Sequence, residues 1–249
     1  DELLEQRPDD IELMYLAIES NAYARNLTRI DSLIDHVTEL TSTAGKALPS
    51  RLRLARANAM VSGELEKSKT NRARAMEIVR AVVANEPMNT HARNMLGRLL
   101  SLQPSPGLPE SERFEPDYKG AIEQYMILSR QLNGSGAQTY LLESFDLAYR
   151  MGDEAQARDL LREYISRFGR DVYNLPTVAE RYENLGDIDR AAELYQQVYN
   201  GSGGLPEAGL SLADLRFRQG RSAQAKELLK EIGKNEVLSR DSVLRMASL

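Results

Sequence analysis

The sequence predicts an all-α protein made of stacked helix hairpins, and three observations lead to this fold class. Glycines recur at intervals of 34 residues, at Gly152, Gly186 and Gly220. An alanine stands five residues after each of them, at Ala157, Ala191 and Ala225. The apolar residues that follow each glycine are spaced by three or four, which is the period of one helix face. A fixed period of this length is typical of repeat proteins, in which neighbouring units bury one another's apolar faces.

Two helices are predicted in each unit, one on either side of the glycine. The second helix carries an apolar stripe, which in the unit after Gly186 consists of Ala191, Leu194, Tyr195 and Val198. The stretches before the glycines, such as residues 177–185 and 210–219, are predicted to be the first helices. We expect each glycine to end its first helix in the left-handed conformation, which glycine adopts without a Cβ clash.

Composition excludes several classes of function. The 249 residues are 42% apolar and 28% charged, which suits a packed core. The chain has no Cys and only two histidines, His36 and His91, so we expect no disulfide, no metal site and no cofactor. Apolar runs such as residues 81–84 are too short to cross a bilayer, so no membrane insertion is expected. The net charge of −5 argues against a nucleic-acid partner. No motif for catalysis is found, so the chain is not predicted to be an enzyme.

The pattern resembles the tetratricopeptide repeat family, whose units place apolar residues at positions 4, 7, 8, 11, 20, 24 and 27 of 34. At these positions the unit 172–205 has Leu175, Val178, Ala179, Tyr182, Ala191, Tyr195 and Val198. The resemblance implies a right-handed superhelix, an α-α solenoid of about six helix hairpins that spans residues 1–249 as a single domain. The predicted units are residues 11–44, 45–89, 90–137, 138–171, 172–205 and 206–239, and residues 240–249 begin a further unit.

A proline-rich insert interrupts the third unit at residues 101–117. It contains Pro104, Pro106, Pro109 and Pro116, and proline cannot continue a helix because it lacks an amide donor. We predict a long loop between two helices. Two interpretations stay open: a loop recruited for binding, and an insertion that is tolerated because added loop length costs little.

The resemblance also implies that the first helices of the units line a concave inner surface, which binds a protein or peptide partner. The inner-face positions, carried over one by one, are Asn94, Arg98, Leu142, Asp146, Tyr149, Arg150, Tyr173, Glu180, Glu183, Asn184, Leu210, Asp214, Phe217 and Arg218. Exposed apolar residues among charges are typical anchors for a partner. Phe217 has a second interpretation, because the neighbouring Arg216 stands where the family usually has an aromatic residue. A shifted helix register would pack Phe217 inside.

The predicted function is a protein–protein interaction scaffold without catalysis. The Lys and Asn residues with which co-chaperone members clamp a carboxylate are not reproduced, so chaperone tails are not expected partners. The chain begins with Asp1 and stops inside a predicted helix, so we expect a processed protein or a piece of a longer one. Two alternatives follow. The chain is an accessory region of a larger enzyme or of an envelope or secretion assembly, or it is a scaffold that forms homo-oligomers. The composition fits both the bacterial cytoplasm and the periplasm.

Overall fold

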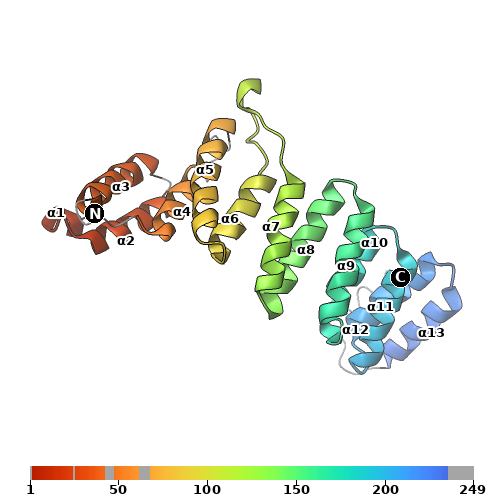
Figure 1. Cartoon of the computed structure of the whole chain (residues 1–249). Helices are drawn as coiled ribbons and strands as arrows, with labels where there is room; N and C mark the ends of the chain where they lie inside the picture. Colours follow the sequence, from red (N-terminus) through yellow and green to blue (C-terminus); the bar gives the residue numbers. More distant parts are fainter. Residues whose placement is uncertain (1, 25, 43–47, 62–67, 235–249) are drawn as a thin grey trace. The chain divides into compact units, whose positions relative to one another are not determined.

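The structure is a computed structural model that describes residues 2–24, 26–42, 48–61 and 68–234 (Figure 1). These residues form α-helices and two short 3₁₀ helices, and no β-strand occurs among them, so the predicted all-α fold class is confirmed. The chain divides into two compact units, residues 1–151 (unit 1) and 152–249 (unit 2), which we describe separately. The boundary falls inside the predicted repeat 138–171, in the turn that follows its first helix.

Unit 1 consists of three helix hairpins and one further helix. A short α1 (Glu2–Gln6), which was not predicted, precedes the hairpins. The hairpins are α2 (Ile11–Tyr23) with α3 (Leu27–Ser42), α4 (Ser50–Ala59) with α5 (Lys69–Asn85), and α6 (Thr90–Ser101) with α7 (Tyr118–Gln131). The three hairpins lie within residues 11–44, 45–89 and 90–137, respectively. Helix α8 (Gly134–Arg150) packs against α7. The first helices are neighbours, since α4 contacts both α2 and α6.

Unit 2 begins with α9 (Glu154–Phe168) and continues with two hairpins. These are α10 (Leu175–Asn184) with α11 (Ile188–Gly201) and α12 (Pro206–Arg218) with α13 (Ser222–Gly233). They match the predicted units 172–205 and 206–239. A 3₁₀ helix, η2 (Val172–Asn174), precedes α10. The predicted start of a further unit at residues 240–249 lies outside the described residues.

In the turns inside the repeats, a glycine ends one helix and the next helix begins directly after it. Gly152, Gly186 and Gly220 have φ values of 72°, 73° and 75°, which confirms the predicted left-handed conformation. Asp153 and Asp187 follow two of these glycines, and each accepts a hydrogen bond from the amide three residues further on, at 3.0 and 3.2 Å. Asp10, Ser68, Asn89 and Asp117 start other helices in the same way. Such a side chain stabilises a helix start by about 1 kcal/mol.

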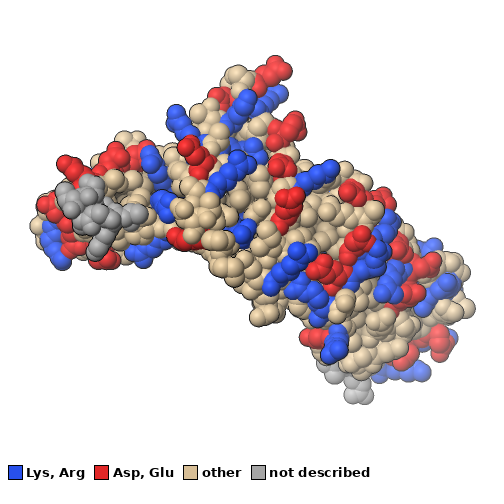
Figure 2. Space-filling view, viewed as in Figure 1, with Lys and Arg blue, Asp and Glu red and all other residues tan. Residues whose placement is uncertain are grey.

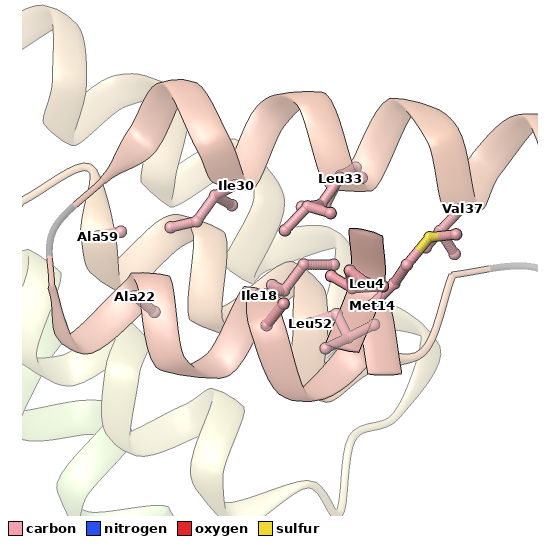
Figure 3. Close-up of a cluster of buried hydrophobic side chains, with 11 residues drawn as sticks. Leu4, Met14, Ile18, Ala22, Ile30, Leu33, Val37, Leu52 and Ala59 are labelled. Carbon is pink, nitrogen blue, oxygen red and sulfur yellow. The ribbon is translucent and has the colours of Figure 1, made fainter. Parts of the chain in front are cut away.

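Apolar stripes on the paired helices make the core of each unit. In unit 2, Ala157, Ala191 and Ala225 are 0% exposed, as their spacing predicts. In unit 1, the cluster drawn in Figure 3 fills the space between α2 and α3 with side chains such as Met14, Ile18, Ile30, Leu33 and Val37. Burying one side chain of this size contributes roughly 1.5–3 kcal/mol. The hairpins therefore hold together mainly by the apolar faces from which they were predicted.

The insert is a folded element that packs on α5. It contains a 3₁₀ helix, η1 (Glu110–Glu112), and projects beyond the ends of α6 and α7 (Figure 1). Arg72 of α5 holds its base: Nε donates to the carbonyl oxygen of Leu99 at 2.8 Å, and Nη2 to that of Leu100 at 3.2 Å. The same guanidinium lies 4.6 Å from the centroid of the Phe114 ring. The predicted boundaries of the insert, 101–117, agree with the helix ends within one residue.

A second contact holds the tip of the insert. The carboxylate of Glu112 accepts hydrogen bonds from the backbone nitrogen and the hydroxyl of Thr70, at 3.1 and 2.9 Å. Thr70 lies in the first turn of α5, where a negative charge is also favoured by the helix dipole. Leu108 is 8% exposed, so the insert has a small apolar interior of its own.

Candidate functional site

The candidate site is the surface that α2, α4, α6 and α8 share in unit 1, which we call the first-helix face. Its middle is set by a close approach between α6 and α7. A Cβ on Gly97 would lie 2.4 Å from Cε1 of Tyr125, so only glycine fits there. The Tyr125 ring is 4% exposed and its centroid lies 5.6 Å from that of Tyr140 on α8. Tyr125 thus forms a floor between α6 and α8.

The first groove on this face has a volume of about 280 Å³ and lies among α2, α4 and α6. Its lining consists of Glu19, Ala22, Arg51, Leu54, Ala55, Asn58, His91, Met95 and Arg98. Four of these residues are apolar, and the polar ones surround them. Arg51 is paired with Glu19, with Nε 3.6 Å from Oε1. The first groove can therefore accept one apolar side chain of a partner.

The second groove has a volume of about 550 Å³ and lies among α6, α7 and α8. It is lined by Asn94, Arg98, Ser101, Leu102, Gln103, Tyr125, Thr139, Tyr140 and Glu143. Burial raises the pKa of Tyr125 and Tyr140, and the charge of Glu143 adds to this. Both hydroxyls are consequently protonated at neutral pH and able to donate a hydrogen bond. The second groove offers donors and acceptors suited to a peptide backbone.

Arg98 lines both grooves, so the two grooves are neighbours on the first-helix face. Its side chain is exposed, and within the described part of the chain no carboxylate lies within 4.0 Å of its guanidinium. Glu143, across the second groove on α8, is likewise exposed and has no Lys, Arg or His nitrogen at ion-pair distance among residues 2–24, 26–42, 48–61 and 68–234.

The remaining predicted residues of unit 1 lie on α8. Leu142 and Asp146 are half-buried, and Arg150 is exposed. Tyr149 is 45% exposed, and its ring stacks on Phe145 with centroids 6.0 Å apart. Of the six residues predicted in unit 1, the structure brings Asn94 and Arg98 together in one groove. His91, which the sequence placed near a helix start, lines the first groove.

In unit 2 the predicted charged residues pair with one another. Arg218 Nη1 lies 2.9 Å from Glu183 Oε2 and 3.8 Å from Asp214 Oδ2. Glu180 and Asn184 are exposed on α10, and Tyr173 is 65% exposed on η2. Next to the charged group, burial raises the pKa of Tyr195 to about 12. The charge of Arg218 is therefore neutralised within the unit.

The expectation that Leu210 is an exposed apolar anchor is wrong, because its side chain is 1% exposed. Helix α12 packs against both α11 and α13, and its buried residues include Ala208, Leu210, Leu212 and Leu215. With apolar residues on several sides of α12, the repeat register did not show which side faces outward. Phe217 is half-buried, and the fully buried neighbour of Arg216 is Leu215. A register shift would have buried Phe217. In the structure, the side chain buried at this point of α12 is that of Leu215.

The sequence did not predict most of the residues that line the first groove, or those that α8 contributes to the second groove. The groove residues of α4 were missed because Ala and Arg alternate along residues 50–59 without a clear stripe. Thr139 had a usable signal, since it occupies the same repeat position as Tyr173, but it was not selected. Tyr140 and Glu143 follow from the packing of α8 on α7.

The surface charges of the protein are mixed, and the described residues hold no cluster that would bind a metal ion. Figure 2 shows Lys and Arg side chains interspersed with Asp and Glu on the visible face, including on the projecting insert. In the ranges that the structure describes, no three His, Cys, Asp or Glu side chains gather as a metal site would require. None of the described helices combines the length and the apolar character needed to span a membrane.

These features define an all-α protein built from antiparallel helix hairpins. The family described as Tetratricopeptide repeat matches residues 185–241, which supports the resemblance inferred from the repeat spacing in that part of the chain. No curated protein matches the chain.

Solved structures with a similar arrangement of helices include those of three other proteins. The crystal structure of MamA has a TM-score of 0.44 and 16% identity, covering 73% of this chain and 94% of that one. YrrB, described as a TPR protein with an unusual peptide-binding site, has a TM-score of 0.47 and 14% identity, covering 85% and 97%. A tetratricopeptide repeat protein from Parabacteroides merdae has a TM-score of 0.43 and 14% identity, covering 98% and 87%. The assignment itself rests on the repeat spacing, the hairpins and the family match.

Proposed function

We propose that the chain is an interaction scaffold that holds an extended segment of a protein partner on the first-helix face of unit 1. One observation carries this proposal: two grooves on this face lie next to each other, share Arg98 in their lining, and together involve α2, α4, α6 and α8. Stacked helix hairpins are an architecture that commonly presents such extended binding surfaces.

The two grooves would bind different parts of the partner segment. Leu54, Ala55 and Met95 of the first groove would bury an apolar side chain of the partner. In the second groove, the Asn94 amide and the tyrosine hydroxyls would hydrogen-bond the partner's backbone. Apart from Leu102 and Gln103 of the insert, both grooves are lined by side chains on packed helices, so little ordering entropy would be lost on binding.

A random octapeptide library displayed on phage tests the proposal with the full chain as bait. We expect the wild type to enrich a family of related peptides. Ala55→Trp, which fills the first groove, and Asn94→Ala, which removes the amide from the second, should each weaken the selected peptides about tenfold or more. Ala55 and Asn94 are both half-buried, so neither change forces a large group into the core.

Arg218→Gln in unit 2 is the matched control and should leave binding unchanged, because that side chain is occupied by Glu183 and Asp214. The circular dichroism spectrum of each variant checks that it is folded. The proposal is wrong if no peptide is enriched, or if binding survives both changes on the first-helix face.

A further inference from the structure

Two opposite charges face each other across the second groove without a partner of their own. Arg98 comes from α6 and Glu143 from α8, and both line the same 550 Å³ space. Other charges on corresponding surfaces are paired: Arg51 with Glu19 in the first groove, and Arg218 with Glu183 and Asp214 in unit 2. Arg98 and Glu143 are therefore two charges of the first-helix face that are available to a bound molecule.

We propose that the partner segment carries an acidic residue that pairs with Arg98 and a basic residue that pairs with Glu143. This inference rests on the proposed function and specifies the chemistry of its ligand. An arginine donates two parallel hydrogen bonds to a carboxylate, and such charge-assisted bonds are about twice as strong as neutral ones. Because both side chains are exposed, each pair contributes mainly discrimination against the wrong charge.

The geometry fixes the order of the three recognition elements. The apolar side chain lies in the first groove, Arg98 stands where the two grooves meet, and Glu143 stands on the far helix of the second groove. The acidic residue of the segment must consequently lie between the apolar residue and the basic one. This order holds whichever way the chain of the partner runs.

Spacing along the segment follows from the helix packing. Helices α4 and α6 contact each other, and packed helices lie 8–10 Å apart; an extended chain advances about 3.3 Å per residue, so the apolar and acidic positions are about three residues apart. A segment of about eight residues spans the apolar, acidic and basic positions.

A charge-swapped variant tests the order directly with the same octapeptide library. The wild type should enrich peptides with an acidic residue in the middle, between an apolar and a basic residue. Arg98→Glu combined with Glu143→Arg should enrich peptides with the basic residue in the middle, and should bind the wild-type peptides at least about tenfold more weakly. Both side chains are exposed, so the swap should leave the helical content and the thermal midpoint unchanged.

The matched control is the swap Glu183→Arg with Arg218→Glu in unit 2, which exchanges a pair that is already formed. It should enrich the same peptides as the wild type. If the enriched peptides show no charge order but still depend on Ala55 and Asn94, the inference falls and the proposed function stands. If no peptide is enriched by the wild type, the proposed function itself falls. A double-mutant cycle on unfolding that couples Arg98 to Glu143 would also overturn the inference, since the two would then be each other's partner.

Discussion

The ring of Tyr125 occupies the space that any side chain on residue 97 would need. Its Cε1 atom lies 2.4 Å from the position of a Cβ on Gly97, and its Cδ1 atom lies 2.9 Å away. The ring is 4% exposed and packs against Tyr140, so it cannot easily move aside. This contact brings α6 against α7, and α6 carries Asn94 and Arg98 over the second groove. The glycine thus supports the site without belonging to it.

Replacing Gly97 with Ala should therefore destabilise the protein. Alanine is the better helix former by about 1 kcal/mol, but overpacking of a close contact costs roughly 1–3 kcal/mol and should prevail. We expect a lower midpoint of urea unfolding, followed by circular dichroism. Gly136→Ala in α8 is the control, because there a Cβ would lie an ordinary 3.4 Å from Leu132 and the change should be neutral or stabilising. A Gly97→Ala variant as stable as this control would contradict the account of the contact.

Gly186 is required for its backbone conformation and not for space. Its φ is 73°, and no atom lies within 4 Å of a Cβ built on it. Gly186→Ala should cost about 1 kcal/mol of unfolding free energy, because an L-residue with a Cβ is strained in the left-handed region. Gly186→Asn should cost less, since asparagine tolerates this conformation better. Equal losses for Ala and Asn in chemical denaturation would show that the strain is not the cause.

Arg72 should control how firmly the insert is held. Arg72→Ala removes two hydrogen bonds to the end of α6 and the contact with the Phe114 ring. We expect trypsin to cut after Arg113 about tenfold faster, because cleavage needs a locally opened chain. The fragment is measured by mass spectrometry at short digestion times. Arg80→Ala, an exposed change on the same helix, is the control and should cleave at the wild-type rate. An unchanged rate for Arg72→Ala would mean that the Glu112–Thr70 contact alone holds the insert.

Stability should fall in strong alkali, in part through Tyr195. Burial raises its pKa from 10 to about 12, so the folded protein keeps the phenol proton at pH values where the unfolded chain has lost it. Unfolding releases a proton between pH 10 and 12, and the unfolding free energy should decrease by about 2 kcal/mol over this range from this residue.

The variant Tyr195→Phe cannot ionise, so its stability should decrease less steeply between pH 9 and 12. Its stability at pH 8 is expected to be lower, because the hydroxyl hydrogen-bonds Ser211 and Glu183. The slope against pH is therefore the quantity to compare, measured by urea unfolding at each pH. Tyr173→Phe, at a position that is 65% exposed, is the control and should follow the wild-type slope. Parallel curves for Tyr195→Phe and the wild type would contradict the assignment.

The class of fold and several helix ends could be predicted because they depend on residues close together in the chain. The left-handed glycines at 152, 186 and 220 were expected from their spacing and from the preference of glycine alone for that conformation. The buried alanines followed from the period of a helix, and the insert from its prolines. The aspartates after Gly152 and Gly186, which cap the next helix, were visible in the sequence but were not used.

The site could be predicted only in part. The repeat positions of Asn94 and Arg98 predicted that they share a face, and both residues line the second groove. The burial of Leu210 was not foreseen, because α12 is apolar on several sides and its outward side depends on what packs around it. The pairing of Arg218 with Glu183 joins residues 35 positions apart, and only the packing of α10 and α12 shows that these charges meet.

By itself, then, the sequence of this chain determined where helices start and stop and which of their sides are apolar. Backbone preferences and helical periodicity are local properties, and they repeat with the 34-residue unit. Only the tertiary structure decided which charges are neutralised and which remain available, as it did for Arg218 and Arg98. That outcome depends on distances of a few ångströms between side chains on different helices, and no local pattern encodes such distances.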